Sequence, residues 1–151
     1  MKLTGILTRE CVRVPIRGTT KTEAITELVD LLAQNELLTD RDMVLKAVLD
    51  REQTASTGIG QGLAVPHGKC TGCSRLVMAL GKPAKPLEFE SKDCKPVDIV
   101  VLLASPVDKT GPHIQALARI SRLMLMDSFR HEVSAAATAD ELWDIICKYE
   151  D

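Results

Sequence analysis

Apolar residues recur at helical spacing near the start of the chain. Residues 19–38 read TTKTEAITELVDLLAQNELL and begin with a capping-box pattern, in which Glu23 follows Thr20 by three positions. Three apolar side chains fall on one face of this segment, namely Ile25, Leu28 and Leu32. The spacing predicts an amphipathic helix.

A second helical pattern follows at once, in residues 39–52. It opens with another such box, Thr39 and Asp42, and one face carries Val44, Ala47, Val48 and Arg51. Arg51 is therefore expected near the end of a helix, just before a glycine-rich turn.

Two further helices are predicted in the second half of the chain. Pro112 suits the first turn of a helix over residues 111–126, with one side expected to comprise Ile114, Leu117, Ala118, Ser121 and Leu125. A third capping box, Thr138 with Glu141, precedes an amphipathic pattern formed by Leu142, Ile145, Ile146 and Tyr149.

Short apolar runs between these helices predict strands. Residues 63–67 and 75–80 are candidates, and the β-branched run of residues 96–104 is typical of a central strand covered on both faces. Strands that alternate with helices predict an α/β fold, with a mixed sheet flanked by helices. The 151 residues are enough for one domain over residues 1–151, and neither repeats nor linkers indicate a second.

The composition of the chain argues against nucleic-acid-binding, membrane-spanning and secreted proteins. The net charge is −2 and aromatic residues are 3%, which argues against a nucleic-acid partner. The longest apolar run, Ile99 to Ala104, is far shorter than the ~20 residues of a membrane span. Charged residues such as Arg9, Glu10 and Arg13 interrupt any signal-peptide core. We therefore expect a cytoplasmic protein without membrane insertion.

The candidate chemistry centres on His67, which lies between Pro66 and Gly68. Proline stiffens the backbone that carries the imidazole, and glycine leaves room beside the ring. A neutral imidazole with open space beside it is suited to nucleophilic attack. Three alternating glycines precede it and are able to present backbone amides to an anion: Gly58, Gly60 and Gly62.

The segment TGIGQGLAVPHGK closely resembles the active-site signature of enzyme IIA domains of the mannitol/fructose class, from the phosphoenolpyruvate-dependent sugar phosphotransferase system. This class includes the stand-alone nitrogen-regulatory type. The segments LDRE, KPVDIVVLLASP, PHIQALARISRLM and ADELWDII also resemble the corresponding family segments, in the family's order. The resemblance covers nearly the whole chain.

The resemblance implies that His67 accepts a phosphoryl group from the phosphocarrier HPr or its nitrogen-branch relative. It implies transfer onward to a cysteine of an enzyme IIB domain, with no metal or organic cofactor. The second active-site histidine of the family matches His113, and its arginine matches Arg51. Both residue types suit the role, since His113 opens a predicted helix and an arginine forms a planar fork to phosphate oxygens.

One departure leaves the sugar class open. Some sugar-specific members carry an acidic residue at the position of Gln61, whose side chain is neutral. A second function therefore stays open, in which phosphorylation of His67 is a signal and the chain is a regulatory binding module for another protein.

The cysteines allow a rival interpretation. His67, Cys70 and Cys73 are spaced as H-x-x-C-x-x-C, and Cys94 would add a fourth ligand for zinc; Cys70 and Cys73 would also serve as a redox pair. The second spaced pair that zinc sites usually show is absent from the sequence, so two incidental thiols are favoured. His131 lies among charges and is expected on a solvated helix face.

Overall fold

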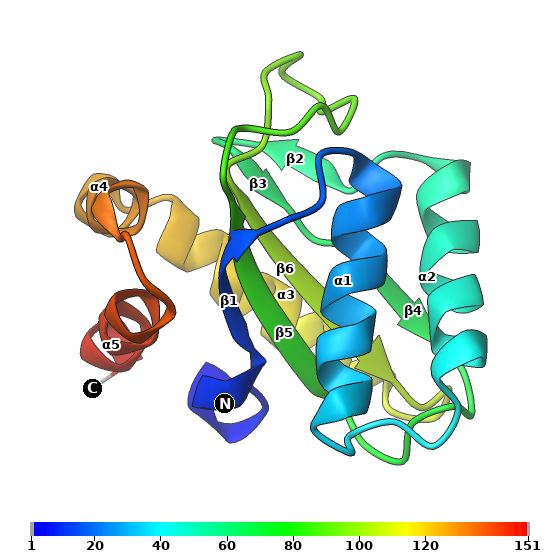
Figure 1. Cartoon of the computed structure of the whole chain (residues 1–151). Helices are drawn as coiled ribbons and strands as arrows, with labels where there is room; N and C mark the ends of the chain where they lie inside the picture. Colours follow the sequence, from blue (N-terminus) through cyan, green and yellow to red (C-terminus); the bar gives the residue numbers. More distant parts are fainter. Residues whose placement is uncertain (1, 151) are drawn as a thin grey trace.

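The computed structural model describes residues 2–150 as a mixed six-stranded sheet between two layers of helices (Figure 1). The sheet has the order β1-β5-β6-β3-β2, and β4 pairs with β6 beyond β3. This is the single α/β domain with a mixed sheet that the alternation of patterns predicts.

The central strand β6 (Ile99–Ser105) organises the sheet. All seven of its residues are buried, as expected for an apolar strand covered on both faces. On one side it pairs antiparallel with β5 (Val77–Pro83). On its other side it pairs parallel with two short strands in succession, β3 (Leu63–Ala64) and β4 (His67–Lys69).

The outer strands complete the sheet. At one edge β2 (Gly58–Gly60) pairs antiparallel with β3, and at the other β1 (Val12–Ile16) pairs parallel with β5. The edge strand β1 was not predicted. It follows two 3₁₀ turns, η1 (Leu3–Gly5) and η2 (Arg9–Cys11), in a segment rich in arginine that hides its strand pattern.

Helices α1 (Lys21–Gln34) and α2 (Arg41–Thr54) cover one face of the sheet. The predicted cap of α1 is confirmed, because Thr20 Oγ1 accepts the backbone N–H of Glu23 at 3.2 Å. The predicted cap of α2 is wrong by one residue. Asp40 caps this helix by accepting the N–H of Met43 at 3.1 Å, and aspartate is among the strongest N-cap residues.

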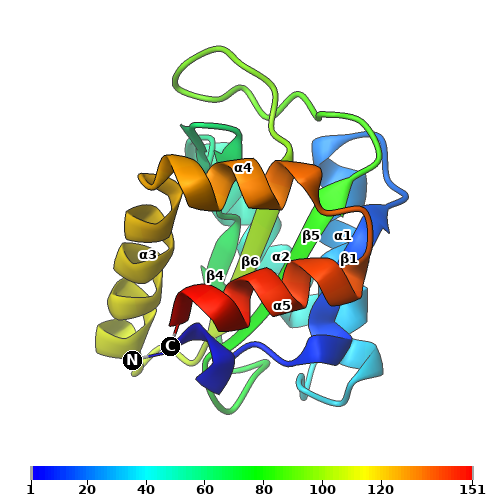
Figure 2. The same ribbon diagram turned by 90° about the vertical axis from the view of Figure 1, so that its left-hand side faces the viewer.

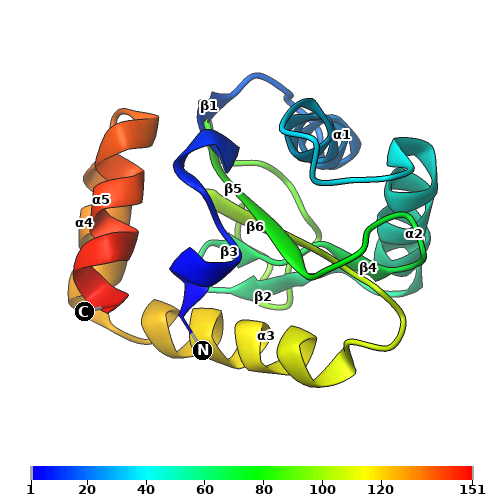
Figure 3. The ribbon, with the colours of Figure 1, turned by 90° about the horizontal axis from the view of Figure 1, so that it is seen from below.

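Helices α3 (Thr110–Met124), α4 (Asp127–Ala135) and α5 (Ala139–Glu150) cover the opposite face (Figures 2 and 3). The cap of α5 is the predicted one, since Thr138 Oγ1 accepts the N–H of Glu141 at 3.1 Å. Among residues 2–150, no helix is both long and apolar enough to span a bilayer.

The predicted inner face of α3 is wrong. Ile114 and Leu125 are 59% and 74% exposed, and the buried side instead carries His113, Ala116, Ile120, Leu123 and Met124. The buried side is a second apolar stripe, offset by about one position from the predicted one, and it includes His113, whose Nδ1 lies beside Ser105 at the end of β6.

Candidate active site

His67 is the first residue of β4, and its ring is oriented by its own backbone. Its Nδ1 lies 2.8 Å from the carbonyl oxygen of Val65. A carbonyl only accepts hydrogen bonds, so Nδ1 carries the proton of the neutral ring and Nε2 keeps a free lone pair. Pro66 lies between the two residues, and its carbonyl accepts the N–H of Leu103 on β6. The imidazole is thereby held with Nε2 as its nucleophilic atom.

His113 lies beside His67, in the first turn of α3. The two ring centroids are 5.1 Å apart, with an angle of 65° between the ring planes. His113 is only 2% exposed, and its Nδ1 lies 3.0 Å from the hydroxyl of Ser105, the last residue of β6. Its Nε2 is buried without a hydrogen-bond partner in the described part of the chain. This orphaned nitrogen is available to a group that binds between the two rings.

Both imidazoles are neutral at physiological pH. Burial lowers the pKa of His67, against the effect of the Val65 carbonyl, and the nearby charge of Arg51 lowers it further. Burial lowers the pKa of His113 to about 4, with smaller contributions from the protonated form of His67 and from the charge of Lys69. A neutral His67 is the form that has a lone pair to donate.

Positive charge surrounds the pair. Arg51, in the last turn of α2, donates from Nη1 to the carbonyl of Ala55 at 2.8 Å. Lys69, at the end of β4, donates from Nζ to Thr110 Oγ1 at 3.1 Å, which places its ammonium by the first turn of α3. The site therefore combines a neutral nucleophile with two cations and a helix N-terminus, which together favour an incoming anion.

Gly68 sets the spacing between His67 and the helix that carries Arg51. A Cβ at this position would lie 2.9 Å from the backbone nitrogen of Val48 and 3.0 Å from the carbonyl carbon of Ala47. Only glycine lets the backbone of α2 approach β4 this closely. The three predicted residues, His67, His113 and Arg51, are thus brought to one end of the sheet.

Comparison with known proteins identifies the family. Residues 5–149 match the model of the family described as "Phosphoenolpyruvate-dependent sugar phosphotransferase system, EIIA 2". The chain belongs to this family. The resemblance inferred from the motifs is confirmed, and the fold places the chain among mannitol-type and nitrogen-regulatory EIIA proteins.

Two relatives illustrate the range of the EIIA family. The chain is 32% identical over 150 residues to the fructose-specific EIIABC component of Bacillus subtilis, covering 99% of this chain but only 24% of that protein. It is 32% identical over 151 residues to the nitrogen regulatory protein of Escherichia coli, covering 99% of this chain and 92% of that protein.

Two solved structures share the EIIA fold. The nitrogen regulatory protein IIA-Ntr of Neisseria meningitidis has a TM-score of 0.87 and 27% identity, with 95% of this chain and 98% of that chain covered. The mannitol enzyme IIA in its complex with phosphorylated enzyme IIB, from Escherichia coli, has a TM-score of 0.80 and 18% identity, with 95% of this chain and 99% of that chain covered.

The glycine turn of this EIIA domain lies away from the two imidazoles. Leu63 pairs with Ile99 and His67 with Leu103, so four residues of β6, about 13 Å, separate the two pairings. Gly60 and Gly62 turn the chain from β2 to β3, with φ of +101° and +77°.

The surroundings of the three glycines also differ from those of the imidazoles. The carboxylate of Asp93 lies near Gly60 and that of Asp98 near Gly62, while the amide of Gly58 donates to Ser56 Oγ. The geometry favours a structural role for these glycines, and their contact with a phosphoryl group stays a prediction.

The described residues give no support to the zinc site that the sequence left open. The residues from Lys2 to Glu150 contain no group of three or more His, Cys, Asp or Glu side chains placed to hold a metal ion. Burial raises the pKa of Cys73 to about 11, so this thiol is protonated and a poor nucleophile at neutral pH. His131 is exposed on α4, as expected.

Two residues of the site were missed by sequence reasoning. Ser105 is fully buried and is hydrogen-bonded to His113. The feature of the sequence that could have indicated it is a single hydroxyl residue at the end of an otherwise apolar strand. Lys69 is two positions after His67, and alternation along β4 puts both side chains on one face of the strand.

Proposed function

We propose that this EIIA domain carries a phosphoryl group on Nε2 of His67. The observation that carries the proposal is the hydrogen bond from Nδ1 to the Val65 carbonyl, which leaves Nε2 unprotonated beside a buried, unpartnered nitrogen of His113. The domain works as a phosphotransferase component in the cytoplasm, without a metal or organic cofactor.

The transfer balances without an added proton. The lone pair of His67 Nε2 forms the new N–P bond, while the N–P bond of a phosphohistidine on an HPr-like carrier breaks and its electron pair stays on the donor nitrogen. The proton on Nδ1 of His67 remains in its bond to Val65. In the onward step a thiolate forms an S–P bond, and the electron pair of the breaking N–P bond returns to Nε2.

Three side chains are proposed to offset the charge of about −2 that the phosphoryl group brings. Arg51 and Lys69 supply positive charge. If Ser105 donates to Nδ1 of His113, then Nε2 of His113 carries a proton to donate to a phosphoryl oxygen. Such donors act by position and charge rather than by covalent chemistry.

The proposed acceptor is a cysteine of an enzyme IIB domain supplied by another chain or another part of the same protein. The mannitol enzyme IIA that shares this fold was solved with phosphorylated enzyme IIB. The B. subtilis relative is an EIIABC component, of which this chain spans about a quarter.

A regulatory role is the second candidate, and the likeness to nitrogen regulatory proteins supports it. The chain is 32% identical to that of E. coli, and the Neisseria IIA-Ntr structure has a TM-score of 0.87. In this role phosphorylation of His67 changes binding to a target protein, and the acceptor cysteine is unnecessary. The chemistry at His67 is the same in both roles.

The experiment is incubation with phosphoenolpyruvate, enzyme I and HPr, followed by intact mass. We expect a gain of one acid-labile phosphoryl group, absent in His67→Ala and retained in His131→Ala. Adding a purified enzyme IIB domain then separates the roles, because only a transport component passes the group on. An unlabelled wild-type protein, or a fully labelled His67→Ala variant, would reject the proposal.

A further inference from the structure

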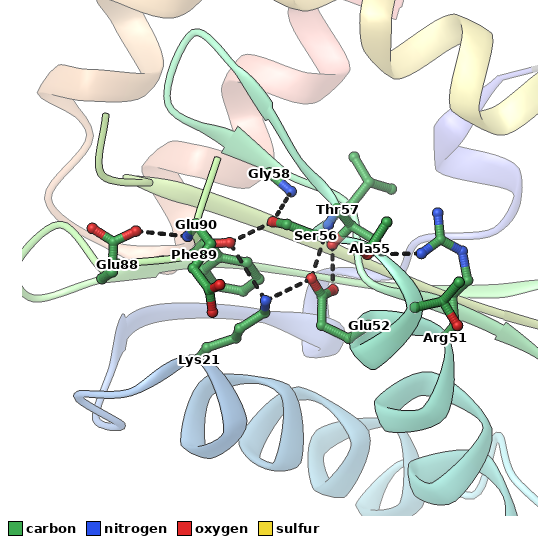
Figure 4. A network of polar contacts seen from close by, with 12 residues as sticks. Lys21, Arg51, Glu52, Ala55, Ser56, Thr57, Gly58, Glu88, Phe89 and Glu90 are labelled. Carbon is green, nitrogen blue, oxygen red and sulfur yellow. Dashed lines mark hydrogen bonds and ion pairs between the residues drawn. The ribbon is translucent and has the colours of Figure 1, made fainter. Parts of the chain in front are cut away.

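Glu52 is a buried carboxylate to which the reaction assigns no part. It follows Arg51 in the last turn of α2 and is 7% exposed. Figure 4 shows it pointing away from Arg51, toward Thr57 and Lys21. Burying a charge is costly unless the charge is paired and hydrogen-bonded, so its position calls for a reason.

Glu52 binds the segment that leaves α2. Its Oε2 accepts the backbone N–H of Thr57 at 2.8 Å, and its Oε1 accepts the hydroxyl of Thr57 at 2.5 Å. The neighbouring Arg51 is tied to the carbonyl of Ala55 in the same segment. Two adjacent side chains therefore hold residues 55–57 at two points, and the place of the guanidinium depends on where Glu52 fixes Thr57.

The same threonine is connected to the nucleophile. The carbonyl of Thr57 accepts the N–H of Val65 at 3.0 Å, and the carbonyl of Val65 accepts Nδ1–H of His67 at 2.8 Å. Thr57 is thus bonded on one side to the segment that holds Arg51 and on the other to the residue that orients His67.

Lys21 is the partner of this buried carboxylate in an ion pair. Its Nζ lies 2.9 Å from Oε2 of Glu52 and 3.4 Å from the carbonyl of Phe89, which also accepts the hydroxyl of Ser56. Nζ further lies 5.4 Å from the centre of the Phe89 ring. Lys21, in the first turn of α1, therefore connects Glu52 with the loop that follows β5 (Figure 4).

We propose that Glu52 is a positioning residue for phosphoryl transfer: through Thr57 it sets the place of Arg51 relative to Nε2 of His67. This inference rests on the proposed function. It requires hydrogen-bonding atoms at position 52 and not the negative charge itself, which would oppose an anionic group on His67.

The test compares substitutions that remove the same charge. Glu52→Ala loses the bonds to Thr57 and Lys21. Glu52→Gln keeps an oxygen for the Thr57 N–H and for Lys21, and its amide N–H donates to the Thr57 hydroxyl. We expect the rate of transfer from phosphorylated HPr to fall about tenfold in Glu52→Ala and by less than threefold in Glu52→Gln.

A matched control lies on the same helix. Asp50 is an exposed carboxylate whose side chain bonds only Lys46 among the described residues, and Asp50→Ala should transfer within twofold of wild type. If Glu52→Ala does not fold, Thr57→Val removes the hydroxyl bond alone while the charge stays in place. It should slow transfer about threefold, whereas a wild-type rate would overturn the proposal.

Two results for the folded variants would also overturn it. One is transfer by Glu52→Ala within threefold of wild type. The other is an equal rate in Glu52→Ala and Glu52→Gln, which would assign the effect to charge. Failure of the proposed function is a separate result, because then the wild-type protein itself accepts no phosphoryl group.

The NMR signals of the His67 ring report its positioning in the absence of any phosphoryl donor. They should shift in Glu52→Ala but not in Asp50→Ala.

Discussion

The two ends of β6 differ in the chemistry gathered around them. At the end where Ser105 lies, the neighbours are two neutral imidazoles and the cations Lys69 and Arg51. At the end where Ile99 begins, the β2–β3 turn runs between the carboxylates of Asp93 and Asp98. One strand therefore separates a positive site from a negative one.

The difference separates two features of the sequence, the alternating glycines and the histidines, by their relation to the proposed phosphoryl transfer. Alternating glycines are conspicuous, yet two of them serve a tight turn with positive φ. The imidazoles are single residues in the sequence. Pairing of β4 with β6 places His67, and the contact with Ser105 at the end of β6 places His113. We expect substitutions near Ser105 to lower the rate of phosphoryl transfer, and substitutions near Ile99 to lower the free energy of unfolding without affecting transfer.

The largest expected effect is at His67. His67→Ala should lose all acid-labile phosphate, because the proposed acceptor is the Nε2 that the Val65 carbonyl orients, while His131→Ala on α4 should be labelled fully. Intact mass after incubation with phosphoenolpyruvate, enzyme I and HPr measures both. Label on the His67→Ala protein would place the acceptor elsewhere.

The next largest effect on the rate of phosphoryl transfer is expected for Arg51→Ala and His113→Ala. Losing one positioned donor to a transferring phosphoryl group should cost about 2 to 4 kcal/mol, or about 30- to 1000-fold in rate. Arg51→Lys should recover only part, since an ammonium cannot make the two-point contact. Quenched-flow transfer from phosphorylated HPr gives the rates, with circular dichroism to check folding. Rates within about threefold of wild type, well under 1 kcal/mol, would remove these two residues from the site.

His113 should also make stability depend on pH. Its folded pKa of about 4 lies below the ordinary 6.5, so the unfolded chain takes up a proton first as pH falls. The stabilisation is complete above pH 6.5 and is lost as pH falls toward 4, by about 2 to 3 kcal/mol. Urea unfolding at pH 7 and pH 4.5 should show a smaller decline in His113→Asn than in wild type; equal declines would contradict the assignment.

The other end of β6 should affect folding alone. At Gly62 φ is +77°, and a Cβ would lie 2.5 Å from Asp98 Oδ1, so Gly62→Ala should destabilise the protein by about 1 to 3 kcal/mol. Its folded fraction should still transfer within threefold of wild type. A loss of transfer as large as that of Arg51→Ala would bring the glycine turn into the site.

The smallest effect is expected at the thiols. Replacing Cys70 and Cys73 with serine should leave phosphoryl acceptance unchanged, because the reaction uses neither. Labelling of the double variant is compared with wild type, and zinc is measured in both. Stoichiometric zinc that disappears in the variant would revive the metal interpretation.

Much of the fold is predictable because it depends on local patterns. The boxes at Thr20 and Thr138 begin helices as predicted, and the apolar run of β6 is the buried centre of the sheet. Predictions from local patterns fail where contacts between distant residues determine which face of a helix is buried. The apolar residues of α3 allow more than one inner face, and the buried one, with Ala116, Ile120, Leu123 and Met124, is the face that also brings His113 to Ser105.

The site divides in the same way. His67, Arg51 and His113 lie in segments that resemble motifs of the family, so the sequence alone makes them candidates. Ser105, the carbonyl of Val65 and the carboxylate of Glu52 are not, because a backbone acceptor carries no residue code and a glutamate near a helix end usually faces solvent. Their roles emerge only when separate segments pack together.

The contact at Gly68 has a consequence for redesign. The distance between α2 and β4 is set there by backbone against backbone, with no rotamer that can adjust. Wherever side chains meet, a library of variants can repack and return the helix to its place. At this contact a side chain on residue 68 would push against the backbone of α2 and displace it. The room beside the His67 ring therefore cannot be changed in small steps by substitutions at position 68. It must be changed by substitutions at other residues that line the site.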